Sequence, residues 1–290
     1  MNMQAYGYAA IVIFSLGITP VARAELHSLS DESLGEVTGQ AFMEVENLSD
    51  AVHDFTRMTL GMEVEARVNI DDLRMGMTDT GIDFAATDVA LGHISRDASR
   101  IQYNGNTYAV GEQVPFEAML PYMELAKAGD ELAGFRFGFG LARGVVSSDT
   151  TTFSGNIGLQ IEDATGTVTP ATLFSADTVA TSYRATHIGI DSLATDCATG
   201  ILCAPLSQLR SLTVGTDNGD GTTGYTDDFF VGFQQENVDW QTLDGAGVIQ
   251  AARGVFLNIP TSMTVNINTL TGDGLAREQT HYIDRGTGIF

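Results

Sequence analysis

The segment Thr216–Asp228 carries the residue types and spacing that come nearest to a metal site. It reads T-D-N-G-D-G-T-T-G-Y-T-D-D. A calcium loop needs hard oxygen ligands at alternate positions, a glycine for the turn and a late carboxylate. Aligned on Asp220-Gly221, the loop places Asn218, Asp220 and Asp227 at the third, fifth and twelfth ligand positions. The pattern therefore indicates a calcium-binding hypothesis for these three residues.

The same loop departs from that pattern at two places. Thr216 occupies the first ligand position, where an aspartate is normally required, and the closing ligand is an aspartate rather than a bidentate glutamate. A second interpretation therefore stays open. In it the loop is an acidic hairpin turn, and its Asn-Gly and Asp-Gly pairs supply positive φ angles.

The two cysteines, Cys197 and Cys203, lie close together in D-C-A-T-G-I-L-C-A-P. In an oxidising compartment such a pair is expected to form a disulfide, which in the chain-entropy model contributes about 2–3 kcal/mol for a short loop. Two cysteines without a nearby histidine are too few for zinc, and the spacing is not that of a redox motif. The sequence thus predicts a structural disulfide.

No spacing typical of catalysis is present. None of the 5 histidines stands in H-x-x-x-H or H-E-x-x-H spacing. The chain also lacks a G-x-S-x-G elbow and a phosphate-binding loop. We therefore expect a protein that is not an enzyme and that needs no cofactor, with Ca²⁺ as the one ion for which a site is suggested.

The elements that would carry these residues are strands. From Arg57 to Asp71 apolar and polar residues alternate without interruption, and a period of two is typical of a strand with one buried and one exposed face. The pattern predicts one long strand with Met58 and its apolar neighbours facing the core and Arg57 facing solvent.

Further alternating segments follow along the chain, at 82–91, 135–141, 153–161, 229–233, 255–259 and 263–267. A short helix is predicted at 121–128, where proline stands first and a glycine follows. The sequence thus predicts an all-β fold, either a large antiparallel sandwich or a β-solenoid-like domain, with a short N-terminal helix.

The first residues have the features of an export signal. Ala9 to Ile18 is apolar but too short to span a bilayer, and Ala22-Arg23-Ala24 is a cleavage signal. We expect a signal peptide at 1–24, an N-terminal helical arm at 25–45 and a single β-rich domain at 46–290. The expected location is the periplasm, the outer-membrane surface or the extracellular space.

The charge excludes one class of partner. The formal net charge is −23, and the loss of Arg23 with the signal leaves −24 on the mature chain. Such a surface repels phosphate backbones and anionic lipid headgroups. We expect no nucleic-acid binding and no membrane embedding.

A resemblance covers the N-terminal segment Leu29–Phe42, which contains L-S-D-E-S-L-G-E-V-T-G-Q-A-F. This segment, directly after a signal peptide, resembles the start of exported proteobacterial pilus or filament system proteins, the FilA-like proteins. The resemblance implies a Gram-negative bacterium and a fibre or pilus context. It implies partners that are other copies of the chain or other surface subunits. Leu29, Leu34, Val37 and Phe42 are the candidate assembly residues.

Together these features predict an exported, non-enzymatic structural or adhesive protein of the cell surface or extracellular space, possessing an acidic surface and one disulfide. Two alternatives remain open at this point. One is an outer-membrane β-barrel protein, and the other is a secreted calcium-dependent binding module.

Overall fold

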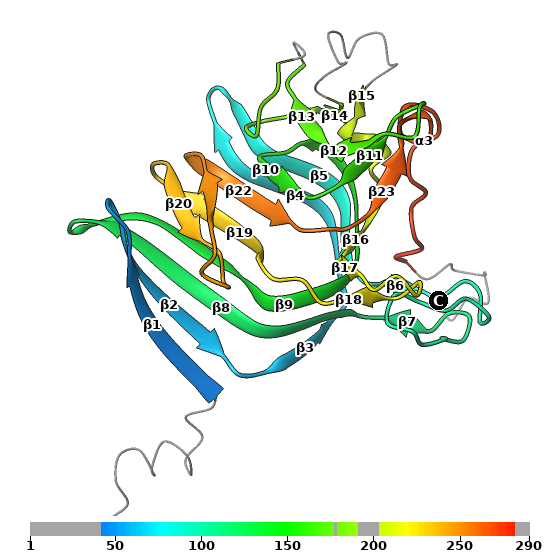
Figure 1. The fold of residues 1–290 in the computed structure, drawn as a ribbon, viewed down its shortest axis with the longest axis horizontal. Helices are drawn as coiled ribbons and strands as arrows, with labels where there is room; N and C mark the ends of the chain where they lie inside the picture. The colour runs from blue at the N-terminus through cyan, green and yellow to red at the C-terminus, as the bar shows by residue number, and fades with distance from the viewer. Residues whose placement is uncertain (1–41, 177–178, 191–202, 282–290) are drawn as a thin grey trace, which may run out of the picture. The chain divides into compact units, whose positions relative to one another are not determined.

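The main sheet is built on one long strand, β9 (Glu131–Thr152) (Figure 1). The computed structural model of the protein describes residues 42–176, 179–190 and 203–281. The other strands of the main sheet are β1 (Met43–Ser49), β2 (Asp54–Leu60), β3 (Glu63–Ala66), β4 (Val68–Thr78), β5 (Gly81–Leu91), β8 (Phe116–Ala128), β10 (Gly155–Ile157), β16 (Ser211–Val214), β19 (Phe229–Gln234) and β22 (Gly254–Ile259).

The two halves of β9 belong to different parts of this sheet. The first half pairs with β8 on one side and with β19 on the other, in the order β1-β2-β8-β9-β19-β22-β10. The second half pairs with β5 and β16, and β5 in turn pairs with β4. These pairings are antiparallel, and only the short β10 joins β22 in parallel within this sheet.

Smaller elements pack on the main sheet. They are β6 (His93–Ile94), β7 (Gln113–Val114), β11 (Gln160–Glu162), β12 (Val168–Pro170), β13 (Thr172–Phe174), β14 (His187–Gly189), β15 (Cys203–Pro205), β17 (Thr216–Asp217), β18 (Thr223–Gly224), β20 (Val238–Gln241), β21 (Val248–Ala251), β23 (Thr264–Asn266), the 3₁₀ helix η3 (Leu206–Gln208) and the helix α3 (Ile267–Thr271). Asn266 caps α3 by accepting a hydrogen bond from the Asn268 N–H at 3.0 Å.

The predicted all-β class is confirmed, and the antiparallel pairing of long strands fits a sandwich. The alternating segments at 82–91, 135–141, 229–233 and 255–259 fall on β5, β9, β19 and β22. The last alternating segment is strand only at β23, because Ile267 begins α3.

The helix predicted at 121–128 is wrong, because these residues form the end of β8. Here β8 pairs with β2 on one side and β9 on the other, and these two ladders outweigh the local helix signals. Gly129 does adopt a positive φ of 61°, but it does so in the turn between β8 and β9.

The single long strand predicted for Arg57–Asp71 is also wrong. The chain breaks at Gly61-Met62 and again at Arg67, which gives β2, β3 and β4. Strands β2 and β3 both pair with β8, whereas β4 pairs with β5. The Gly61 N–H donates to the Phe42 carbonyl at 2.8 Å, and this fixes the first break beside β1.

The predicted facing is inverted on β2, whereas on β3 the apolar residues are more covered than the glutamates, as predicted. Arg57 is 5% exposed, whereas Met58 is 44% exposed. On β8, likewise, Tyr122 and Glu124 are buried while Met123 is exposed. An alternating pattern shows that successive side chains point to opposite faces of the strand. Which of the two faces is buried depends on the elements that pack against the sheet.

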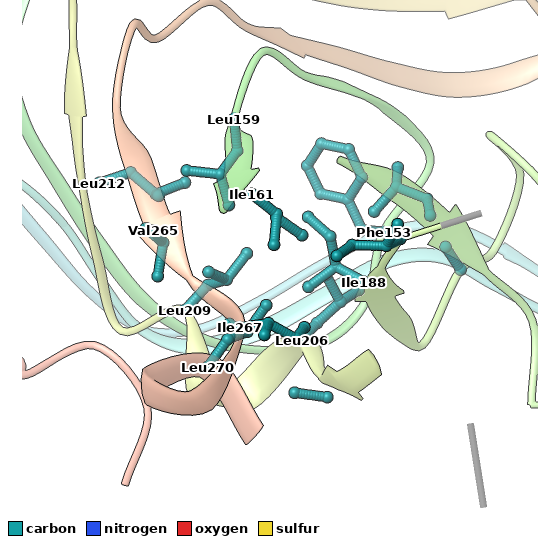
Figure 2. Packing of buried hydrophobic residues seen from close by; sticks show 14 of the residues in the cluster. Phe153, Leu159, Ile161, Ile188, Leu206, Leu209, Leu212, Val265, Ile267 and Leu270 are labelled. Carbon is teal, nitrogen blue, oxygen red and sulfur yellow. The ribbon is translucent and has the colours of Figure 1, made fainter. Parts of the chain in front are cut away.

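Two apolar clusters cover parts of the sheet. One lies under the β20–β21 hairpin and centres on Trp240, which is fully buried against Phe55 at a ring distance of 5.7 Å. The other joins η3, β11, β23 and α3 to the β4–β5 end of the sheet. Figure 2 shows this second cluster, where Ile161, Leu206 and Ile267 point toward one another.

The expected domain boundary shifts slightly. Residues Phe42–Phe290 form one compact unit, and β1 begins at Met43, so residues 43–45 belong to the sheet rather than to a helical arm. The predicted signal peptide and the short N-terminal helix lie outside the described residues.

Candidate functional site

One face of the main sheet carries a contiguous set of exposed apolar side chains. Met43 and Val45 lie on β1, and Met58, Met123, Leu125 and Phe137 lie on β2, β8 and β9. These six residues are called the open apolar face. Single exposed apolar residues are ordinary on soluble proteins, but a contiguous apolar patch marks a site of interaction.

The register of the sheet makes this face continuous. Val45 lies opposite Met58, Met58 opposite Met123, and Met123 opposite Phe137. Directly opposed side chains on adjacent strands are in contact distance of one another. Beside this row the Phe135 and Phe233 rings stack with centroids 5.0 Å apart. The result is an apolar band that crosses four neighbouring strands.

The opposite side of the same strands is charged and buried. Glu46, Arg57, Glu124 and Arg136 stand opposite one another in register across β1, β2, β8 and β9. These four residues are called the charged row. Arg136 Nε donates to Glu124 Oε2 at 2.7 Å, and Arg57 Nε donates to the same oxygen at 3.3 Å. Charges alternate in sign along the row, so each buried charge has an opposite neighbour.

Arg136 is surrounded by a carboxylate, a carbonyl and aromatic rings, and its Nη1 makes no hydrogen bond within the described residues. It is fully buried, and its Nη2 donates to the Gln241 carbonyl at 2.6 Å. Its guanidinium carbon lies 4.8 Å from the Phe230 ring centroid, 5.0 Å from that of Trp240 and 5.4 Å from that of Tyr122. Stacking on aromatic faces suits the weakly hydrated guanidinium. The charged row therefore ties the sheet to the β20–β21 hairpin.

This row has no access for a substrate. Glu124 and Arg136 both have no exposed surface, and Tyr122 and Trp240 close over them. Its arrangement can fix the strands in register, and it leaves the open apolar face as the accessible side.

Asp228 adds a titratable group beside the row. Its Oδ1 lies 3.8 Å from Arg136 Nη1 and accepts a hydrogen bond from the Leu243 N–H at 3.2 Å. Burial raises the pKa of this carboxyl to about 6, and the Arg136 charge opposes the rise. The folded state therefore keeps a proton that the unfolded chain has lost near pH 5. This contribution to stability is fully present below about pH 4 and is lost as the pH rises through about 6.

The free energy of unfolding of the Asp228→Asn variant is accordingly expected to fall less between pH 4.5 and 7 than that of the wild type. The expected difference is on the order of 1–2 kcal/mol across that range, after allowance for solvent screening. Asparagine tolerates the positive φ of 57° at this position. Urea denaturation at several pH values measures the effect. The exposed Asp239→Asn serves as the control, and parallel pH profiles for wild type and Asp228→Asn would contradict the assignment.

The apolar side of the sheet continues from the open face into a cavity of about 410 Å³. One wall is formed by β9, β19 and β22, and the facing wall by β4 and β5. Phe137 belongs both to the open apolar face and to the cavity wall. This space is called the sheet pocket. Pockets that hold small organic ligands have volumes of about 300–1,000 Å³.

The lining of the sheet pocket is almost wholly apolar. Only Ser148 and Thr150 bring side-chain oxygens, and these two hydroxyls bond to each other at 2.8 Å. The apolar lining residues are Val68, Ile70, Leu73, Met75, Phe84, Val89, Leu91, Phe137, Phe139, Val146, Phe153, Ile157, Leu206, Leu209, Leu212, Phe229, Phe230, Val231, Leu257 and Ile259, with Gly138 between them. Among the residues that the structure describes, no ionisable side chain lines it.

The loop predicted as a calcium site is the tight hairpin β17–β18. Gly219 and Gly221 have φ angles of 75° and 86°, as the hairpin interpretation expects. The Asp220 carboxylate accepts from the Thr222 N–H and hydroxyl, which hold the pKa of Asp220 below its usual range. Asn218 Nδ2 donates to the Thr222 hydroxyl at 2.9 Å.

The third residue of that hypothesis, Asp227, lies after β18 and before β19. Within residues 42–176, 179–190 and 203–281, no group of three or more His, Cys, Asp or Glu side chains is placed to hold a metal ion. Calcium binding by Asn218, Asp220 and Asp227 stays a prediction.

The remaining candidates fall at the limits of the described chain. Cys203 is buried in β15, and its expected partner Cys197 lies outside the described residues, so the disulfide stays a prediction. Leu29, Leu34 and Val37 also lie outside them. Phe42 is exposed and leads directly into β1 at the edge of the open apolar face.

The sequence does not reveal the open apolar face, because its residues fall in different predicted elements. Met123 and Leu125 lie in the predicted helix, Met43 and Val45 in the predicted arm, and Met58 on a face predicted to be buried. The signal for it is the alternation of charge sign among Glu46, Arg57, Glu124 and Arg136. Charges that neutralise one another across strands can be buried, which leaves the apolar side of those strands exposed. That alternation becomes visible only when the strand order and register are known.

Comparisons with known proteins do not identify a relative. No protein-family model matches the chain, and no curated protein or solved structure matches it either. In the part of the chain that the structure describes, none of the helices has the length and apolar character needed to cross a bilayer.

Proposed function

We propose that this is an exported, non-enzymatic structural or adhesive protein of the periplasm, outer-membrane surface or extracellular space. It works by packing its open apolar face on a second copy of the same chain, in a pilus- or fibre-associated assembly. The observation that carries this proposal is the unbroken row Val45, Met58, Met123 and Phe137 on exposed, paired strands.

The charged row, on the opposite side of the same strands, supports the proposal. A face that docks must hold its shape before it meets a partner, because ordering side chains and strands on binding costs free energy. Arg57, Glu124 and Arg136 join three of the four strands by hydrogen bonds on the covered side. The open face is therefore rigid, with its apolar side chains presented on regular strands rather than loops.

Magnitudes indicate what kind of association this face supports. Full burial of a large apolar side chain contributes about 1.5–3 kcal/mol, and these six are already about half covered. Their further burial is worth on the order of 6 kcal/mol, against an association cost of at least about 4 kcal/mol. The face alone thus gives weak binding, which a second contact or a high local concentration in a fibre would strengthen.

The N-terminal segment is the second contact in this proposal. Residues 25–41 of the mature chain join Phe42, which enters β1 at the rim of the open apolar face. Leu29, Leu34 and Val37 give this segment apolar side chains of its own. In the assembly these side chains, with Phe42, contact a neighbouring copy. The resemblance of Leu29–Phe42 to FilA-like proteins supports the same role.

Self-association of the mature chain is expected to rise with salt. The chain carries a net charge of −23 before signal removal, so copies repel one another at low ionic strength. Salt screens that repulsion, and apolar contacts are not weakened by it. Sedimentation velocity of the chain starting at Glu25, in about 50 mM and about 1 M NaCl, tests this. A strictly monomeric chain at every salt and protein concentration would overturn the proposal.

Removal of the N-terminal segment separates the two contacts. A chain that starts at Met43 is expected to associate at least about tenfold more weakly than one that starts at Glu25, because only the face remains. The domain should stay folded, since β1 is retained, with a melting temperature lowered only by loss of the bond from the Gly61 N–H to the Phe42 carbonyl. Equal association of both chains would show that the segment takes no part and would leave the face as the only contact.

A further inference from the structure

We infer that the sheet pocket binds one uncharged, unbranched aliphatic chain, such as that of a long-chain alcohol. This goes beyond the proposed assembly role, because it concerns a small ligand at the covered end of the sheet. The inference rests on the enclosure of the pocket between β4–β5 and β9–β19–β22, on its volume and on its lining.

The lining selects against most ligand classes. A sugar, a nucleotide or an amino acid would bury hydroxyl, phosphate or ammonium groups against carbon, without partners. A peptide segment lying against the wall side chains would bury its own N–H and C=O groups in the same way, since the backbones of β9 and β19 are paired on both sides. A hydrocarbon chain has no polar groups, so it enters the pocket without losing hydrogen bonds to water.

The shape of the lining suits a flexible chain rather than a rigid ring system. Met75, Leu73 and Ile70 on β4 all line the pocket, and Asp71 between them has no partner in the β4–β5 register. Unbranched methionine and the branched aliphatic side chains adapt to a chain in several conformations. The volume of about 410 Å³ lies inside the range of small-ligand sites.

The pocket is open at the start of β4 as well as beside Phe137, which is 49% exposed. Val68 and Ile70 line the pocket, and each is 37% exposed. The next residues along the strand are Asp71 and Asp72, which are exposed. An anionic headgroup at the start of β4 would meet the carboxylates of Asp71 and Asp72, the latter paired with Arg74 at 3.0 Å, and the negative charge of the whole chain. The ligand is therefore uncharged at its polar end.

The hydroxyl pair Ser148 and Thr150 is the one polar feature inside. The two oxygens bond to each other at 2.8 Å, so both retain acceptor capacity and the hydrogen of the accepting hydroxyl is not used within the pair. A terminal alcohol that reached this pair would find a partner there, whereas a bare alkane would leave the pair as it is. The pair accommodates a hydroxyl end and requires no charge.

Titration of the full mature chain with 1-decanol tests the inference. We expect saturable binding of one molecule per chain by calorimetry, and a rise in melting temperature that follows the bound fraction. Decanoate at pH 8 is expected to bind at least about tenfold more weakly, because its carboxylate is repelled. The absence of a saturable 1-decanol signal would overturn the inference, and equal binding of decanoate would overturn the uncharged headgroup.

Variants locate the site. Ile70→Gln at the start of β4 and Ser148→Phe, which fills the pocket, are each expected to weaken 1-decanol binding at least about fivefold. Val248→Gln, on an exposed strand position elsewhere, is the matched control and should bind as wild type does. Melting curves without ligand show that each variant is folded. Unchanged binding in both pocket variants would overturn the assignment.

The assembly role and the ligand site can fail separately. Met58→Gln with Met123→Gln changes the open apolar face but no residue of the pocket lining. This double variant should bind 1-decanol as wild type does. Loss of binding in it would mean that the alcohol coats the open face, and the pocket assignment would be wrong.

Discussion

Glu124→Gln lowers the free energy of unfolding by about 3–5 kcal/mol, because it removes the closest anion from two buried guanidinium groups. Within the described residues, Glu124 is the only carboxylate that both Arg57 and Arg136 reach, through bonds at 3.3 Å and 2.7 Å. Glu46 lies 3.5 Å from Arg57 alone and Asp228 3.8 Å from Arg136 alone. The surrounding rings of Tyr122 and Trp240 offer no charge in its place. Urea denaturation of the mature chain measures the change.

The control for this variant is Glu63→Gln, which neutralises an exposed glutamate on β3. It should change stability by less than about 0.5 kcal/mol. A double-mutant cycle with Arg57→Met gives the interaction energy between the two side chains. A loss below about 1 kcal/mol for Glu124→Gln would contradict the view that this row fixes the strands.

The triple variant Met58→Gln, Met123→Gln and Phe137→Thr is expected to weaken self-association at least about 100-fold. Large side chains at the centre of an interface each cost about 1–2 kcal/mol or more when replaced, and all three lie in one row across β2, β8 and β9. Stability should change little, since the three side chains are about half exposed in the monomer. Sedimentation velocity measures the association.

A matched variant distinguishes this effect from a general change in surface character. Ile101→Thr, Val168→Thr and Val248→Gln replace three exposed apolar residues that lie off the open apolar face. This chain should associate as wild type does. If both triple variants weaken association equally, the face has no special part in assembly.

The strands could be predicted from the sequence, but their facing could not. Alternation in Phe135, Phe137 and Phe139 indicates a strand whichever side is covered, since a period of two is symmetrical between the faces. What covers the Arg136 side is the β20–β21 hairpin, whose Trp240 lies about a hundred residues further along the chain. Burial of charge therefore depended on contacts distant in sequence.

The helix predicted at 121–128 failed for a related reason. Proline at its start and Gly129 at its end are local signals, and they are satisfied equally well by a strand followed by a turn. Pairing with both β2 and β9 decided the outcome. Local propensity is a weak guide wherever a segment lies in the middle of a sheet.

The sheet pocket lay beyond prediction altogether. Its walls come from Val68–Leu91 and from Phe229–Ile259, which meet only because the halves of β9 pair with different partners. By contrast, the hairpin at Asn218–Asp220 was within reach of the sequence, because its glycines and aspartates act on neighbouring residues.

Methionine oxidation in the assembled protein tests the central claim most directly. Met58 and Met123 lie on the open apolar face, and Met77, which is 68% exposed on β4, lies off it. A brief exposure of cell envelopes or of the associated protein to hydrogen peroxide, followed by mass spectrometry, gives the rate at each residue. In the monomer we expect Met58 and Met123 to be oxidised as fast as other exposed methionines. In the assembly we expect their oxidation to be at least about tenfold slower, while Met77 is oxidised at the same rate in both states. Equal rates at all three methionines in the assembled protein would contradict packing through this face.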